Sequence, residues 1–266
     1  VGEMIAGVVL GPSLFGLFWP DIQQQIFPAD TMPVLYFGAQ VGVGLYMFLV
    51  GLEFNTGLFK QQARSAIAVS LAGMLVPFTV AALLCIWLLE IPGLFAANIS
   101  YGNAALFLGA AIAITAFPML ARIIYERGLS GTSLGALALA AGAIDDAAAW
   151  TVMAVVLASF GGGALLAVKA VVGGVAYATL MFTKVTGWLQ PLADRIEAKG
   201  EMSWGQFAFL LVLFAMSAYS MEWVGLHAVF GGFILGIAMP RGAIVDHLRK
   251  RLEKITIFVL LPMFFT

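Results

Sequence analysis

AAGAIDDAAAW, at residues 140–150, sets two adjacent aspartates, Asp145 and Asp146, in an otherwise apolar run. If a helix begins near Leu134, Asp145 lies about 16 Å along it, because each residue adds about 1.5 Å. That depth is close to the middle of a bilayer whose hydrocarbon core is about 30 Å thick. A carboxylate is costly there and usually marks an ion or proton path. This acidic doublet therefore indicates a functional site inside a membrane.

The composition of the whole chain also indicates a membrane protein. Of its 266 residues, 62% are hydrophobic and 10% are charged, with a mean hydropathy of +1.02. Soluble domains carry about 25% charged residues, so a soluble globular protein is excluded. The apolar runs are continuous rather than alternating, which argues against a β-barrel, and the net charge of −1 argues against a nucleic-acid partner. A single cysteine and two distant histidines offer no resident metal site, so no cofactor is expected.

We predict an all-α polytopic membrane protein with eight substantial helices and the start of a ninth. The apolar runs are close to the roughly 20 residues that cross a bilayer as a helix. They cover residues 1–18, 34–54, 65–89, 102–125, 133–159, 164–184, 204–221 and 224–240, and the ninth opens near 255. If the helices alternate in direction, all of the 13 Lys and Arg residues except Lys169 fall on one side. The positive-inside rule makes that side cytoplasmic.

A weak internal repeat indicates how the chain is organised. AGVVLG at residues 6–11 is similar to GGFILG at residues 231–236, and each carries two glycines four residues apart that allow close helix packing. Seven helices separate the copies, so they run in opposite directions, as in the inverted repeats of secondary transporters. We expect residues 1–266 to be one transport domain, cut at both ends. Residues 1–159 then hold most of the first repeat, residues 160–200 a linker helix and cytoplasmic connection, and residues 201–266 the start of the second repeat. Within the connection, the polar stretch 184–203 is expected to lie along the membrane surface.

The second strong signal is a proline near the centre of the predicted helix 102–125. Pro118 lacks a backbone donor and clashes with the carbonyl four residues earlier, that of Ile114. A kinked or unwound helix frees carbonyl oxygens, which is tolerable at membrane depth only where protein or a water-filled cavity satisfies them. Such carbonyls, the Thr115 hydroxyl and a carboxylate from the doublet are hard oxygen ligands. They suit a small monovalent cation.

These two segments resemble the most specific parts of a known transporter family. ITAFP followed by AR, at residues 114–122, and IDDAAAW, at residues 144–150, look like the heart of the second branch of the monovalent cation:proton antiporters. IAGVVLGPSLFG, LYMFLVGLEFN and LLPMFF, which begin at residues 5, 45 and 260, resemble that family too. The resemblance runs nearly from end to end.

The resemblance implies an inverted-repeat antiporter fold with a discontinuous crossing helix. It implies a dimer whose protomers combine a dimerisation domain with a mobile core domain. The ion-binding carboxylate falls on Asp146, and Asp145, at the variable position before it, is expected to take part in cation and proton binding as a second titrating group. The crossing-helix break falls on Thr115, Ala116, Phe117 and Pro118, so a monovalent cation would bind at Asp146 and Thr115.

We therefore expect exchange of Na⁺ or K⁺ for protons by alternating access, in a multi-pass protein of a bacterial inner membrane. Burial and a neighbouring acid both oppose the ionised form of a carboxyl group, so protons and cations can compete for it. A sodium-coupled solute symporter of similar inverted-repeat fold and a cation channel stay open as alternatives. An intramembrane aspartyl protease fits poorly, because its two acids must come from separate helices. Transport rather than enzyme chemistry is expected.

Three further charged residues lie near predicted cytoplasmic helix ends, namely Glu53, Arg122 and Glu126. One interpretation is interfacial anchoring and an ion pair. The other is an accessory cluster that senses pH and governs access from the cytoplasm.

Overall fold

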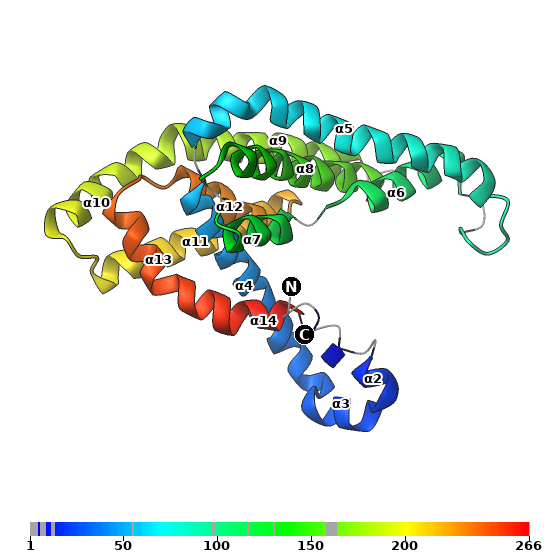
Figure 1. Cartoon of the computed structure of the whole chain (residues 1–266), viewed down its shortest axis with the longest axis horizontal. Coiled ribbons are helices and arrows are strands. Elements are labelled where there is room, and N and C mark those ends of the chain that lie inside the picture. Colours follow the sequence, from blue (N-terminus) through cyan, green and yellow to red (C-terminus); the bar gives the residue numbers. More distant parts are fainter. Residues whose placement is uncertain are drawn as a thin grey trace. The chain divides into compact units, whose positions relative to one another are not determined.

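The computed structural model describes residues 5, 9–11, 14–54, 56–96, 99–115, 117–129, 131–157 and 164–265. Within these ranges every regular element is a helix, so the all-α prediction is confirmed. Half of the predicted helix 1–18 lies outside the described residues, and in the other half Gly11 forms a bend and Phe15–Phe18 form a separate short helix. The chain divides into two compact units, and Figure 1 shows their helices in sequence colours.

Unit 1 comprises residues 1–52, 181–219 and 228–266, so the chain enters it three times. Its helices are α2 (Phe15–Phe18), α3 (Pro20–Ile26), η1 (Ala29–Thr31), α4 (Met32–Glu53), the π-helical turn η3 (Met181–Val185), α10 (Thr186–Lys199), α11 (Trp204–Val224), α12 (Ala228–Ala238), α13 (Ala243–Ile255), the π-helical turn η4 (Thr256–Leu260) and α14 (Leu261–Phe265). The last residues of α4 and α11 belong to unit 2.

Unit 2 comprises residues 53–180 and 220–227. Its helices are α5 (Thr56–Leu88), α6 (Tyr101–Ala113), α7 (Phe117–Glu126), α8 (Ser133–Leu157) and α9 (Ala164–Leu180). Both aspartates of the doublet and the predicted helix break belong to this unit.

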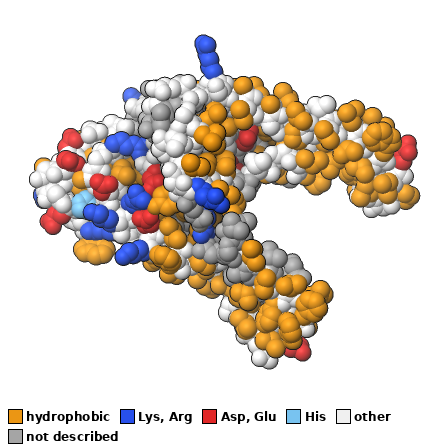
Figure 2. All heavy atoms as spheres, in the orientation of Figure 1, with side chains coloured by type: hydrophobic (Ala, Val, Ile, Leu, Met, Phe, Trp, Pro, Cys, Tyr) orange, Lys and Arg blue, Asp and Glu red, His pale blue; other side chains and the backbone are white. Residues whose placement is uncertain are grey.

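Five described helical stretches are long and apolar enough to cross a membrane. They are Ala29–Glu53, Gln61–Leu88, Ser133–Met153, Val168–Lys199 and Trp204–Val224, and two shorter apolar helices are Tyr101–Ala113 and Ala228–Ala238. Many of their large apolar side chains are exposed, as expected where lipid is the solvent. Figure 2 shows hydrophobic side chains over much of the visible face, while charged side chains gather near α10 and α13. The chain is a polytopic membrane protein.

Unit 1 is held together by the close approach of α4 and α12. A methyl group added at Gly51 would collide with the Phe233 carbonyl oxygen, and one added at Gly236 would collide with that of Phe48. Only glycine allows the two backbones to lie so near each other. The helix packing predicted from the glycines of GGFILG is therefore present.

The helix predicted over 164–184 is longer than expected. It continues through η3 into α10 and ends at Gly200, whose positive φ of 68° caps it in the left-handed conformation. The stretch 184–203 is therefore mainly the end of one long helical run, because no residue before Gly200 terminates the helix. The position of its amphipathic part along the membrane surface stays a prediction.

Candidate ion-binding site

The helix predicted over 102–125 is broken in two. Helix α6 ends at Ala113, and Ile114 takes an extended conformation with φ −68° and ψ 115°. Thr115 is also non-helical, and α7 begins at Phe117. The missing N–H of Pro118 explains the position, because it would otherwise donate to the carbonyl of Ile114.

The four residues of the predicted break do not all lie in the non-helical segment. Thr115 lies in the non-helical segment and is exposed, whereas Phe117 and Pro118 form the first turn of α7. Proline is well tolerated there because first-turn N–H groups have no partner inside the helix. Ala116 and the side chain of Pro118 lie outside the described part. We call Ile114 and Thr115 the helix break.

Asp145 points towards α5. Its Oδ1 accepts a hydrogen bond of 2.5 Å from the hydroxyl of Ser70, which is 1% exposed. A Cβ atom built at Gly73, nearly one turn further along α5, would lie 3.8 Å from the Asp145 Oδ2. The carboxylate therefore rests on a small-residue face of α5.

Asp146 lies on a different face of α8, because adjacent helical residues diverge by about 100°. It shares a face with Gly142, one turn earlier. A Cβ atom built at Gly142 would lie 2.8 Å from Leu120 Cδ2 and 2.9 Å from Phe117 Cδ2, so this face of α8 meets α7.

The register between α7 and α8 indicates where the helix break lies along α8. The turn between Glu126 and Ser133 reverses the chain, and Phe117 and Gly142 each lie nine residues from it. Asp146 lies four residues beyond Gly142, or about 6 Å, so we expect it near the level of residues 114 and 115. Asp146 itself is half-buried.

The surroundings of the doublet are small and apolar. Ala66 of α5 packs in a buried cluster with Ala140 and Ala141 of α8, and Leu137 and Ile144 cover it. Among the described residues, no lysine or arginine forms an ion pair with Asp145 or Asp146. The doublet is therefore not held there as half of a structural salt bridge within the described chain.

Two residues of this region were not singled out from the sequence. Ser70 and Gly73 lie in an apolar helix where serine and glycine are ordinary residues. The only available signal was a hydroxyl group at about the depth of the doublet.

The accessory residues take the following positions. Glu53 is the last residue of α4, and Arg122 lies in the middle of α7. Both make interactions with other residues, so neither is a free charge. The side chain of Glu126 lies outside the described part, and a pH-sensing role for the three stays a prediction.

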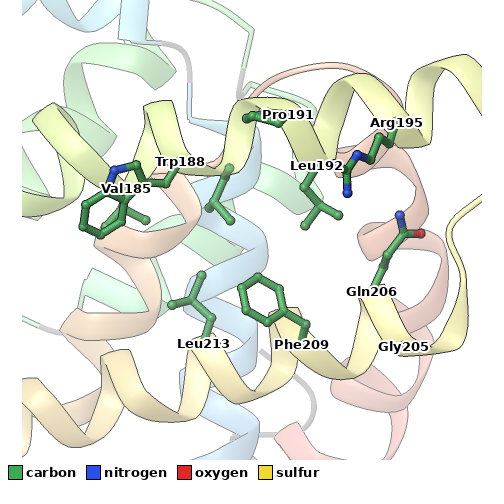
Figure 3. A pocket seen from close by; sticks show the side chains of 10 residues that line it. Val185, Trp188, Pro191, Leu192, Arg195, Gly205, Gln206, Phe209 and Leu213 are labelled. Carbon is green, nitrogen blue, oxygen red and sulfur yellow. The ribbon is translucent and has the colours of Figure 1, made fainter.

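A separate hollow of about 480 Å³ lies in unit 1 between α10 and α11. Figure 3 shows side chains from both helices around it, with Arg195 and Gln206 at one end. Its lining is otherwise mainly apolar and contains no carboxylate. A cation site with carboxylate ligands is therefore better placed at the doublet.

The sequence of this chain is similar to a family of known transporters along its whole length. The family model "Sodium/hydrogen exchanger, transmembrane" matches residues 1–266. The Na⁺/H⁺ antiporter NhaS4 of Synechocystis sp. (strain ATCC 27184 / PCC 6803 / Kazusa) is 37% identical over 273 residues, which cover 100% of this chain and 65% of that protein. K⁺/H⁺ antiporter 1 of Saccharomyces cerevisiae (strain ATCC 204508 / S288c) is 31% identical, and cation/H⁺ antiporter 20 of Arabidopsis thaliana is 29% identical. Both matches cover 100% of this chain but only 31% and 33% of those proteins, respectively.

Proposed function

This chain belongs to the sodium/hydrogen exchanger family, and from that premise we propose that it exchanges a monovalent cation for protons across a membrane. The cation is Na⁺ or K⁺, since the names of its relatives include both kinds of antiporter. The observation that supports the proposal is a half-buried carboxyl group, that of Asp146, one turn beyond the point where α8 meets the first turn of α7.

The chemistry is competition for one carboxylate. Ionised Asp146 attracts a dehydrated cation, and a proton bound to the same carboxyl group removes that attraction. The cation and the proton therefore occupy the site in turn. The surroundings are apolar and have a low dielectric constant. The ionised and the protonated carboxyl group therefore differ more in their attraction for the cation than they would in water.

The helix break supplies the remaining oxygen ligands. The last carbonyl groups of α6 lack intrahelical donors, and the C-terminal end of a helix carries partial negative charge. These carbonyls and the Thr115 hydroxyl would complete a shell around a cation held by Asp146. The first turn of α7 presents N–H groups and partial positive charge on the other side of the break, which would stabilise the ionised carboxylate when the cation has left.

Transport also requires the loaded site to face each side of the membrane in turn. We assign the movement to unit 2, because α5 to α8 carry the doublet and the break as one compact body. A buried unneutralised carboxylate is expensive to move through hydrocarbon, so unit 2 moves when Asp146 holds either a cation or a proton. Homodimerisation, which the family resemblance implies, is part of the same proposal.

The direct test is exchange by the full-length protein in membrane vesicles. Asp146→Asn keeps the shape of the side chain but removes the charge, so we expect cation-driven proton movement to fall to the background of empty vesicles. The matched control is Asp194→Asn on α10, an exposed aspartate that accepts a hydrogen bond from Gln190. It should retain parental exchange.

The same assay separates the alternatives. Exchange that persists in Asp146→Asn would contradict the assignment of the carboxylate. Sodium uptake that depends on an organic solute and moves no protons would indicate a symporter, and downhill cation flux without proton counter-flow would indicate a channel.

A further inference from the structure

Ser70 makes an unusual hydrogen bond for a serine in an apolar helix. Serine and threonine side chains in helices often donate to a carbonyl one turn earlier in their own helix, as Thr79 of α5 does to Leu75. The hydroxyl of Ser70 instead donates across to Asp145 on α8, at 2.5 Å. Ser70 is one of only three polar or charged residues among the buried described residues.

The packing around this bond leaves Asp145 little freedom. Ala66 lies one turn before Ser70 and packs on Ala140 and Ala141, which fixes the register of the two helices. A Cβ atom at Gly73 would lie in ordinary van der Waals contact with the second carboxylate oxygen, 3.8 Å away. The carboxylate of Asp145 therefore rests against the small-residue face of α5.

This contact separates the two carboxylates of the doublet. Asp145 is held against α5, whereas Asp146, about 100° further round α8, lies on the face that meets α7. We propose that Ser70 is a positioning residue, which holds Asp145 against α5 and so leaves Asp146 as the carboxylate that meets the transported cation. The proposal rests on the exchange function proposed above and adds a residue to it.

Removal of the Ser70 hydroxyl would leave the Asp145 carboxylate without its hydrogen-bond donor. A buried carboxylate without its donor seeks another polar partner, because an unsatisfied polar group in an apolar medium is costly. The first turn of α7, whose Phe117 meets Gly142, lies on the neighbouring side of α8. A released Asp145 would compete with Asp146 for the polar groups at this turn and disturb the cation shell.

The experiment compares Ser70→Ala with Ser70→Thr in the full-length protein, with cation concentration varied in the vesicle exchange assay. Loss of a hydrogen bond to a charged group should raise the KM for the cation about tenfold or more, with kcat within about twofold of the parent. Threonine keeps the donor and should restore a parental KM. Ser65→Ala, an exposed serine on the same helix, is the matched control and should leave KM unchanged.

An Asp145→Asn background tests whether Ser70 acts through its partner. The neutral amide needs the donor less than a carboxylate does, so adding Ser70→Ala should change KM less than twofold there. The same increase in both backgrounds would overturn the proposal, as would a parental KM in Ser70→Ala. A Ser70→Thr protein that is as thermally stable as the parent yet has the KM of the alanine variant would also overturn it.

The two proposals fail in different ways. If Asp146→Asn abolishes exchange while Ser70→Ala behaves like the parent, the exchange function stands and the positioning role falls. If Asp146→Asn retains exchange, the exchange site itself is misassigned, whatever the serine variants do.

Discussion

The two carboxyl groups of the doublet differ because of what lies beside each of them on α8. Asp145 has a hydroxyl donor on α5, and Asp146 continues the face on which Gly142 meets Phe117 and Leu120. Adjacent residues on a helix cannot face one partner. The different roles proposed for Asp145 and Asp146 therefore follow from helix geometry once α8 is packed between α5 and α7.

Gly142 tests this packing at the scale of one residue. Its substitution by alanine would place a Cβ atom 2.9 Å from the ring of Phe117, which is 1% exposed and has little room to move. Overpacking of this kind costs about 1–3 kcal/mol. We expect Gly142→Ala to lower the apparent Tm of the purified full-length protein by a few degrees.

Gly102→Ala in α6 is the control, because an added Cβ there meets nothing within 4 Å. It should leave the apparent Tm unchanged or slightly raised, as alanine is the better helix former. Equal stability of the two variants would contradict the contact between α7 and α8 on which the position of Asp146 depends.

Some of these residues could be recognised from the sequence and others could not. Asp145, Asp146 and Pro118 are conspicuous because charge and proline are costly in an apolar helix. Ser70 was missed because a hydroxyl group is ordinary in a membrane helix. Its role appears only when the register of α5 against α8 is known, and no local pattern specifies that register.

At the scale of elements, two prolines in unit 2 have different effects. Pro118 follows a break, whereas α5 continues without interruption through Pro77. The residues before Pro118 include the β-branched Ile112, Ile114 and Thr115, which lose side-chain freedom in a helix. The β-branched Val76 and Gly73 likewise precede Pro77, so helix propensity does not explain why only Pro118 follows a break.

Pro118→Ala tests whether this break is needed. Alanine restores the N–H that can donate to the carbonyl of Ile114, and a proline inside a helix disfavours the helix by about 3 kcal/mol. We expect α6 and α7 to form one continuous helix more readily. The rate of cation-driven proton exchange in vesicles should then fall on the order of tenfold. Pro77→Ala is the matched control and should remain within about twofold of the parent. Parental exchange by Pro118→Ala would show that the break is not required.

The sequence predicted the elements better than their ends. The break was expected over Thr115 to Pro118, but Phe117 and Pro118 begin the next helix because proline fits a first turn. The polar stretch 184–203 is mainly the continuation of α9 through η3 and α10. Polarity indicated where the chain leaves an apolar environment, but it could not show that the helix itself goes on.

At the scale of the whole molecule, the doublet and the break lie in the same unit of the chain. Unit 2 contains both, whereas unit 1 collects three separate segments around α4 and α12. Hydropathy predicted the helices and the membrane, and the ion-binding role of the doublet stays a prediction. The sequence could not predict which helices group together, because that depends on contacts between segments far apart in the chain.

The central claim is that a proton and a cation occupy Asp146 in turn, and it is tested most directly by calorimetric titration of the purified full-length protein with NaCl or KCl. Repeating the titration in two buffers of different ionisation enthalpy gives the number of protons released for each cation bound. The account predicts that cation binding releases protons from the parent, and that Asp146→Asn neither binds the cation nor releases protons. Cation binding without proton release, or binding and release that survive in Asp146→Asn, would contradict it.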